Sequence, residues 1–135
     1  PTIRPVKHGF LSSRFGRRMD PFTGRLTYHR GVDYSVRKGA PIYATANGVV
    51  AFTGKWSRFG TVVEISHGHG YVTRFAHISK VFVKKGQHVK RGDVIARVGA
   101  TGKATAAHLH YEVLQDGKHK NPLGFIISDE QIACY

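Results

Sequence analysis

The sequence predicts an all-β protein whose antiparallel strands form a sandwich or a barrel-like fold. Short runs of β-branched and aromatic residues alternate with glycine turns, which recur roughly every 8 to 12 residues. No window of about a dozen residues shows sustained helical periodicity. The clearest strand runs are Val49–Phe52, Thr61–Ile65, Tyr71–Phe75 and Val94–Val98.

The chain of 135 residues is predicted to form one domain, without a linker or an internal repeat. Residues 1–27 are expected to be mostly a loop that leads into the domain, because three prolines interrupt them. Residues 28–124 form the predicted core, and residues 125–135 form a C-terminal tail.

Turns of recognisable composition connect the predicted strands. Ser66–Gly70 is predicted to be a hairpin connection, so we interpret His69 as a hairpin residue without a metal role. Asp116–Gly117 is a tight-turn dipeptide. Gly86 and Gly92 bracket a predicted tight turn that leads into the last strand run.

The chain is strongly basic. Lys and Arg number 21 against 8 Asp and Glu, which gives a net charge of +13 and a pI near 10.3, and the densest stretch covers residues 84–91. Such a charge attracts polyanions, for example an acidic polymer, anionic lipid or nucleic acid. Aromatic residues beside basic ones would also suit single-stranded nucleic acid. A solvated basic face that aids solubility is the plain alternative, and we expect no specific nucleic-acid partner.

Composition also limits where the chain acts. It has no apolar run of about 18 residues, so we expect no membrane span within it. Cys134 is the single cysteine, and its place near the chain end argues against a nucleophile held in a fixed geometry. Because the first residue is Pro rather than Met, we expect an export signal or an anchor upstream.

Two histidines begin the strand-like run after the glycine-containing segment 99–107. His108 and His110 are two residues apart, so on a strand they share one face at a distance of about 7 Å. Glu112 shares that face. Its carboxylate can accept the spare N–H of a histidine or pair with a surface Lys or Arg, and the sequence leaves both interpretations open.

Further metal-binding residue types lie upstream. His29 and Asp33 would be about 13 Å apart in a straight strand, too far to share an ion. Gly31 lies midway between them, where a bend costs least. Together with His77 and the two later histidines, these residues match the ligand set of a catalytic zinc. The alternative is a set of surface histidines on a basic protein.

The segments that contain these residues are SSRFGRRMDPFTGRLTYHRGVD, GAPIYATANGVVAFTG, GTVVEISHGHGYVTRFAHIS, GQHVKRGDVIARVGATG and HLHYEV. In this order they resemble the lysostaphin-like zinc metallopeptidases, the LytM-type cell-wall endopeptidases. The resemblance runs from about Ser12 to about Gly124. The pattern FG-x-R followed by DP-x-TG is most similar to the Gram-negative branch, which cuts peptide cross-links in peptidoglycan.

The resemblance implies a role for each of five residues. His29, Asp33 and His110 are expected to bind one zinc ion, with water in the fourth place, and His77 and His108 to be catalytic histidines that do not bind the metal. Spacing alone does not decide between His108 and His110 as the ligand. Every metal and catalytic position is filled, which favours an enzyme with the LytM-type fold and its substrate groove.

The implied chemistry is metal-assisted hydrolysis of an amide bond. Zinc lowers the pKa of a bound water and polarises the scissile carbonyl group. The chain lacks His-Glu-x-x-His, and none of its three glutamates is next to a ligand in sequence. We therefore expect His77 or His108 to be the general base and the other to stabilise the oxyanion. Neither Gly-x-Ser-x-Gly nor a complete phosphate loop is present.

By resemblance, the substrate is the D-alanyl–diaminopimelate cross-link of peptidoglycan, and glycine bridges are the next possibility. The chain is expected to act as a monomer in the periplasm or cell envelope. Residues 104–107 read Ala-Thr-Ala-Ala where the family often has Ser-Thr-Gly-Pro, which bears on substrate detail rather than on the metal ligands. The rival interpretation is a non-catalytic module that binds the wall or activates another hydrolase.

Overall fold

The computed structural model describes residues 1–19, 23–99 and 107–126. Most of residues 104–107, as well as Cys134, therefore lie outside the described part. Its elements are β1 (Phe10–Ser13), β2 (Gly16–Met19), β3 (Leu26–His29), β4 (Val32–Ser35), β5 (Pro41–Tyr43), β6 (Gly48–Trp56), β7 (Gly60–Gly68), β8 (Tyr71–Ala76), β9 (Ile78–Val81), β10 (His88–Val89), β11 (Val94–Val98), β12 (His108–Gln115), β13 (Lys118–Lys120) and the 3-10 helix η1 (Pro122–Gly124).

The strands form three sheets, and their pairings are antiparallel. The large sheet has the order β1-β4-β12-β8-β7-β6-β10, with β13 paired to β12. A smaller sheet has the order β5-β11-β9, and β2 pairs with β3 alone. This confirms the prediction of an all-β, antiparallel fold. Within the described ranges no helix is long and apolar enough to cross a membrane.

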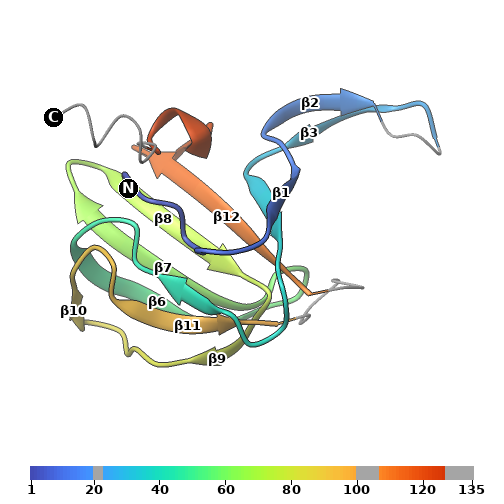
Figure 1. The fold of residues 1–135 in the computed structure, drawn as a ribbon. Coiled ribbons are helices and arrows are strands. Elements are labelled where there is room, and N and C mark those ends of the chain that lie inside the picture. The colour runs from blue at the N-terminus through green and yellow to red at the C-terminus, as the bar shows by residue number, and fades with distance from the viewer. Residues whose placement is uncertain (20–22, 100–106, 127–135) are drawn as a thin grey trace, which may run out of the picture.

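One apolar core lies between the large sheet and the small sheet. Figure 1 shows β9 and β11 of the small sheet lying across the strands of the large one, while the β2–β3 hairpin projects from the body. Burial of one large apolar side chain in this core stabilises the folded state by about 1.5–3 kcal/mol. The burial of many such side chains holds the two sheets together. The core residues include Val50, Val63, Ile65, Phe75 and Tyr111 from the large sheet, with Ile42, Ile95 and Val98 from the small one.

The four predicted strand runs lie in β6, β7, β8 and β11, so this part of the prediction is confirmed. Gly68 pairs with Tyr71 across the predicted hairpin between β7 and β8. Asp116 and Gly117 have φ angles of 51° and 79°, both in the left-handed region. The predicted Asp-Gly turn therefore joins β12 to β13, as expected of a tight hairpin.

Within residues 1–27 the structure places β1, β2 and the start of β3, and the remaining described residues lie outside strands. β1 pairs with β4, and β2 pairs with β3. The short strand β10, between Gly86 and Gly92, also pairs with β6. These strands are two to four residues long and lack a β-branched run. β1 and β10 are fixed by pairing with strands distant in sequence, and sequence alone does not show such partners.

β12 lies between β4 and β8 in the large sheet, and its two faces have different roles. Successive side chains of a strand point to opposite faces. The residues at its core face are Leu109, Tyr111 and Val113. The alternate residues, on the other face, are His108, His110 and Glu112. The strand therefore anchors the candidate site directly in the most buried part of the fold.

Candidate metal centre

Three side chains from β3, β4 and β12 converge at one point. Asp33 and His110 lie directly opposite each other on β4 and β12, with His110 Nδ1 2.8 Å from Asp33 Oδ1. His29 Nε2 lies 3.4 Å from Asp33 Oδ2. One ligand atom from each of the three residues lies within 4.8 Å of the others. Among the described residues, this is the cluster whose spacing suits a metal ion.

Gly31 allows the break between β3 and β4 to lie close to β12. A Cβ atom at this position would meet the carbonyl oxygen of Tyr111, and would lie 2.9 Å from Glu112 Cγ and 3.0 Å from His110 Cε1. The φ angle of Gly31 is outside the left-handed region. The chain bends at Arg30 and Gly31, as the sequence predicted, and the close packing against β12 is a second reason for a glycine here.

The two histidines of the cluster each use their second ring nitrogen elsewhere. His29 Nδ1–H donates to the carbonyl oxygen of Arg14 at 2.9 Å, and His110 Nε2–H donates to Glu112 Oε2 at 2.8 Å. These bonds orient both rings and leave His29 Nε2 and His110 Nδ1 facing Asp33. Glu112 also forms an ion pair with Arg74. Both interpretations of Glu112 left open by the sequence are therefore correct.

Hydrogen bonds control the charges of the cluster. Burial raises the pKa of Asp33, but hydrogen bonds from His110 and His29 outweigh it and hold the pKa well below its usual range. Burial lowers the pKa of His110, but its bonds to Asp33 and Glu112 outweigh this and raise the pKa to about 9. Without a metal, His110 is therefore an imidazolium that donates through both nitrogens at neutral pH.

His77 and His108 form a second pair beside the cluster. Their ring centroids are 4.6 Å apart, and His77 lies 6.4 Å from the ring of His110. His77 has a φ angle of 61° and is 7% exposed. Its backbone N–H donates to Phe59 O, and its carbonyl oxygen accepts from Gly99 N–H. These two bonds hold a left-handed conformation that is otherwise unfavourable for histidine.

The sequence analysis did not identify two residues that contact this site: Phe59, which lies beside His110, and Arg74, which lies beside Glu112. The ring of Phe59 stacks on His110 with a centroid distance of 5.4 Å and an interplanar angle of 13°. Arg74 reaches Glu112 from β8. No local pattern marks either residue, because each meets the site only through strand pairing and loop placement.

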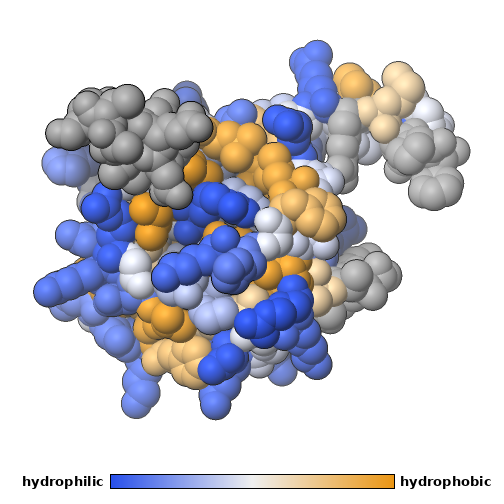
Figure 2. Space-filling model, in the orientation of Figure 1, coloured by the Kyte–Doolittle hydropathy of each residue, from blue (hydrophilic) through white to orange (hydrophobic). Residues whose placement is uncertain are grey.

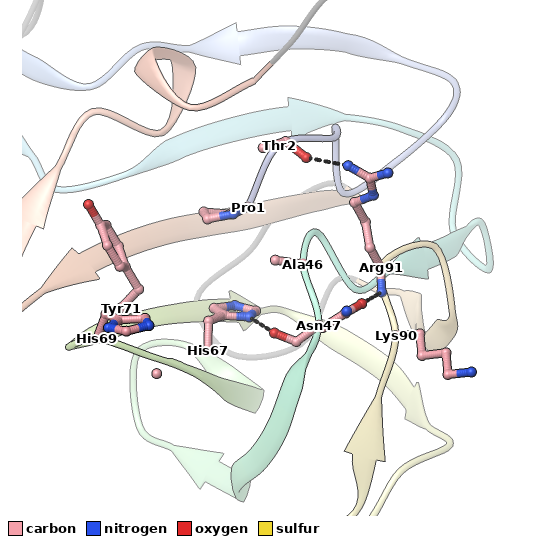
Figure 3. Close-up of a pocket in the computed structure, with 10 residues that line it drawn as sticks. Pro1, Thr2, Ala46, Asn47, His67, His69, Tyr71, Lys90 and Arg91 are labelled. Atoms are coloured by element: carbon pink, nitrogen blue, oxygen red, sulfur yellow. Dashed lines mark hydrogen bonds between the residues drawn. The ribbon is translucent and has the colours of Figure 1, made fainter. Parts of the chain in front are cut away.

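A separate hollow of about 650 Å³ lies at the other end of β7 and β8, away from the metal cluster. His67 and His69, the second His-x-His of the chain, are among its lining residues (Figure 3). Both ring nitrogens of His67 are engaged, Nδ1 with Asn47 O at 2.7 Å and Nε2 with Thr73 Oγ1 at 2.8 Å. His69 is exposed in the turn, with a φ angle of 52°.

Apolar and hydrophilic side chains gather on different parts of the visible surface (Figure 2). Figure 2 shows apolar side chains on the projecting β2–β3 hairpin and mostly hydrophilic surface over the lower part of the molecule. Met19 and Leu26, which pair across the hairpin, are 66% and 63% exposed, and Tyr28 is 54% exposed. His29 pairs with Gly16 at one end of this hairpin, and Met19 and Leu26 pair at the opposite end.

The model of the family described as "Peptidase family M23" matches residues 27–122 of the chain. This range includes the three residues of the metal cluster as well as His77 and His108. The chain belongs to peptidase family M23. This confirms the resemblance to LytM-type peptidases. The chain is 42% identical over 119 residues to the peptidoglycan DD-endopeptidase ShyC of Vibrio cholerae. It is 37% identical over 130 residues to the DD-carboxypeptidase/endopeptidase Mpg of Neisseria meningitidis.

Solved structures agree with the fold of the M23 domain. A zinc-containing peptidase from Vibrio cholerae superposes with a TM-score of 0.83 at 41% identity, covering 89% of this chain and 38% of that one. The catalytic domain of lysostaphin from Staphylococcus simulans superposes with a TM-score of 0.77 at 27% identity, covering 87% of this chain and 91% of that one. The lysostaphin-type architecture expected from the sequence is therefore confirmed.

The M23 domain corresponds to only part of its curated relatives. The match covers 87% of this chain but 28% of ShyC, and 96% of this chain but 30% of Mpg. The chain therefore spans less than a third of the length of these relatives.

Proposed function

We propose that the M23 domain is a zinc-dependent endopeptidase that hydrolyses peptide cross-links of bacterial peptidoglycan. The observation that carries this proposal is the pairing of two groups: a His29–Asp33–His110 cluster of metal-ligand spacing, and the His77–His108 pair next to it. A metal site alone would suit a structural ion. A second pair of imidazoles beside it supplies the proton transfer that hydrolysis needs.

The donor set fits a catalytic zinc ion. Two imidazole nitrogens and one carboxylate are three ligands, which leaves a fourth place for water or substrate, as catalytic zinc sites require. The second nitrogens of both histidines are held by hydrogen bonds outside the cluster, so the nitrogens that face Asp33 are oriented for a metal. When bound there, zinc polarises a carbonyl group and lowers the pKa of water.

His77 and His108 are proposed to move the protons of the reaction. One imidazole takes a proton from the attacking water, and the other donates a hydrogen bond to the oxyanion of the substrate. His77 is buried, with its backbone fixed on both sides, whereas His108 is half-buried. The pair therefore offers one rigid group and one group closer to solvent, which suits a site that must receive a polymer.

The relatives favour a D-alanyl–diaminopimelate bond as the cleaved bond. ShyC is named a peptidoglycan DD-endopeptidase, and Mpg a DD-carboxypeptidase/endopeptidase. Cleavage of glycine bridges is the second candidate, because the fold is also that of the lysostaphin catalytic domain. The net charge of +13 would draw the domain to an anionic wall polymer. We propose that it works in the periplasm or cell envelope, as a monomer with zinc as the metal.

Digestion of purified peptidoglycan, followed by analysis of the muropeptides, tests the proposal. The zinc-loaded chain is expected to convert cross-linked dimers into stem monomers, and both chelation and His110→Ala are expected to stop this. Digestion of a glycine-bridged wall in parallel distinguishes the two candidate bonds. A folded, zinc-loaded chain that cuts neither wall would contradict the proposal and favour a non-catalytic module that activates another hydrolase.

A further inference from the structure

Arg74 holds a buried carboxylate behind the metal cluster. We propose that Arg74 is a positioning residue of the metal centre: it fixes Glu112, which in turn orients the ring of His110 toward the metal. This inference rests on the zinc site proposed above. It adds a residue on β8, remote from the cluster, to those that determine metal affinity.

A row of alternating charges crosses three neighbouring strands. Glu64 on β7 and Glu112 on β12 both lie opposite Arg74 on β8. Arg74 Nε donates to Glu64 Oε2 at 2.8 Å, and Arg74 Nη1 donates to Glu112 Oε1. Opposite charges directly across a sheet stabilise each other, so the register itself places the guanidinium between two carboxylates.

Glu112 passes this constraint to the metal cluster through its other oxygen. Glu112 Oε2 accepts from His110 Nε2–H at 2.8 Å, and His110 Nδ1 faces Asp33 on the opposite side of the ring. The ring can offer Nδ1 to a metal only while Nε2–H keeps its acceptor. The position of the Glu112 carboxylate therefore determines the direction in which the ligand nitrogen points.

Burial makes Glu112 dependent on its cation. Its side chain is 2% exposed, against 16% for that of Arg74. His119 Nε2 also lies 3.1 Å from Glu112 Oε1, and the guanidinium of Arg74 lies 4.7 Å from the centre of the Trp56 ring. A buried carboxylate that loses its permanent cation is strongly unfavourable, so it must move or rearrange its partners. Either response shifts the acceptor of His110.

Metal affinity measured without catalysis tests this role. Arg74→Met keeps the length of the side chain but removes the charge, and Glu64→Gln is the matched control, because it alters the other end of the row. Zinc affinity is measured by competition with a chromophoric chelator, and ligand geometry by the visible spectrum of the cobalt-substituted chain. We expect about 10–100-fold weaker zinc binding and an altered cobalt spectrum for Arg74→Met. For Glu64→Gln we expect a change within about threefold.

A double-mutant cycle tests whether Arg74 acts through Glu112. Glu112→Gln should weaken zinc binding by itself, and adding Arg74→Met to it should change the affinity no further. The double variant replaces a buried ion pair with neutral side chains, a change that folds often tolerate. It therefore gives a result even if Arg74→Met alone does not fold.

Two results would overturn the inference: a folded Arg74→Met chain with wild-type zinc affinity and cobalt spectrum, or a further loss of affinity when Arg74→Met is added to Glu112→Gln. Equal affinities of Glu112→Gln and the double variant, both weaker than wild type, would support it. A wild-type chain that binds no zinc would instead contradict the proposed function itself, so the two failures are distinguishable.

Discussion

His77 follows β8 and His108 begins β12, and their imidazole rings are held with centroids 4.6 Å apart. The first of these rings lies 6.4 Å from that of His110, so the pair borders the metal cluster without being part of it. In the proposed mechanism, metal binding and proton transfer are therefore carried out by different side chains. Single substitutions should therefore affect the two tasks independently.

His108→Ala is expected to abolish hydrolysis while zinc is retained. Loss of a general acid or base lowers the rate by about 10²–10⁴-fold. His110→Ala should lose both activity and zinc, because it removes a ligand. Zinc content per folded chain, measured beside muropeptide release, checks both outcomes. A folded His108→Ala chain without zinc would show that the ligand assignment within His-x-His is reversed.

His77→Asn is expected to remove activity with little loss of stability. Asn tolerates the left-handed backbone conformation found at this position, with a φ angle of 61°, better than Ala does. His77→Ala should therefore be the less stable of the two variants by about 1 kcal/mol, with zinc retained in both. Thermal unfolding and zinc content measure this. Hydrolysis by His77→Asn at the wild-type rate would remove His77 from the mechanism.

Gly31→Ala is expected to weaken both folding and metal binding. The new Cβ would meet the carbonyl oxygen of Tyr111 and lie 3.0 Å from His110 Cε1, so β12 or the histidine ring must shift. Such overpacking costs about 1–3 kcal/mol. Gly39→Ala is a control, because a Cβ there meets no atom within 4 Å, although its φ angle of 88° still carries strain. Wild-type zinc affinity in Gly31→Ala would contradict the close packing described above.

Zinc uptake at neutral pH is expected to release a proton from His110. The pKa of this residue in the metal-free chain is raised from its usual 6.5 to about 9. The stability that its protonation contributes is therefore fully present below about pH 6.5 and is lost as the pH rises through about 9. A metal must displace that proton, so zinc affinity should rise with pH up to about 9. Calorimetric titration in buffers of different ionisation enthalpy at pH 7 measures the release. Uptake without proton release would mean that His110 is already neutral.

The sequence predicted the parts of the fold that depend on local patterns. The strand runs, the Asp116–Gly117 turn and the shared face of His108, His110 and Glu112 all follow from residue type and a period of two. The resemblance to LytM-type peptidases assigned the roles of His29, Asp33 and His110. The structure brings these three residues together, as that assignment requires.

The remaining features depend on which strands are neighbours. Glu64, Arg74 and Glu112 form one row only because β7, β8 and β12 pair in a particular register. Each residue alone looks like an ordinary charged position on a strand. Gly31 shows the same limit: the sequence marks a glycine, but only the approach of β12 explains why a side chain cannot fit there.

The most direct test of this account is an anomalous difference map collected at the zinc edge from crystals of the zinc-loaded chain. We predict one peak bound by His29 Nε2, the Asp33 carboxylate and His110 Nδ1, with His77 and His108 close by but not bound. A peak ligated by His108 or His77, or no peak at this cluster in a chain that retains zinc, would contradict the account.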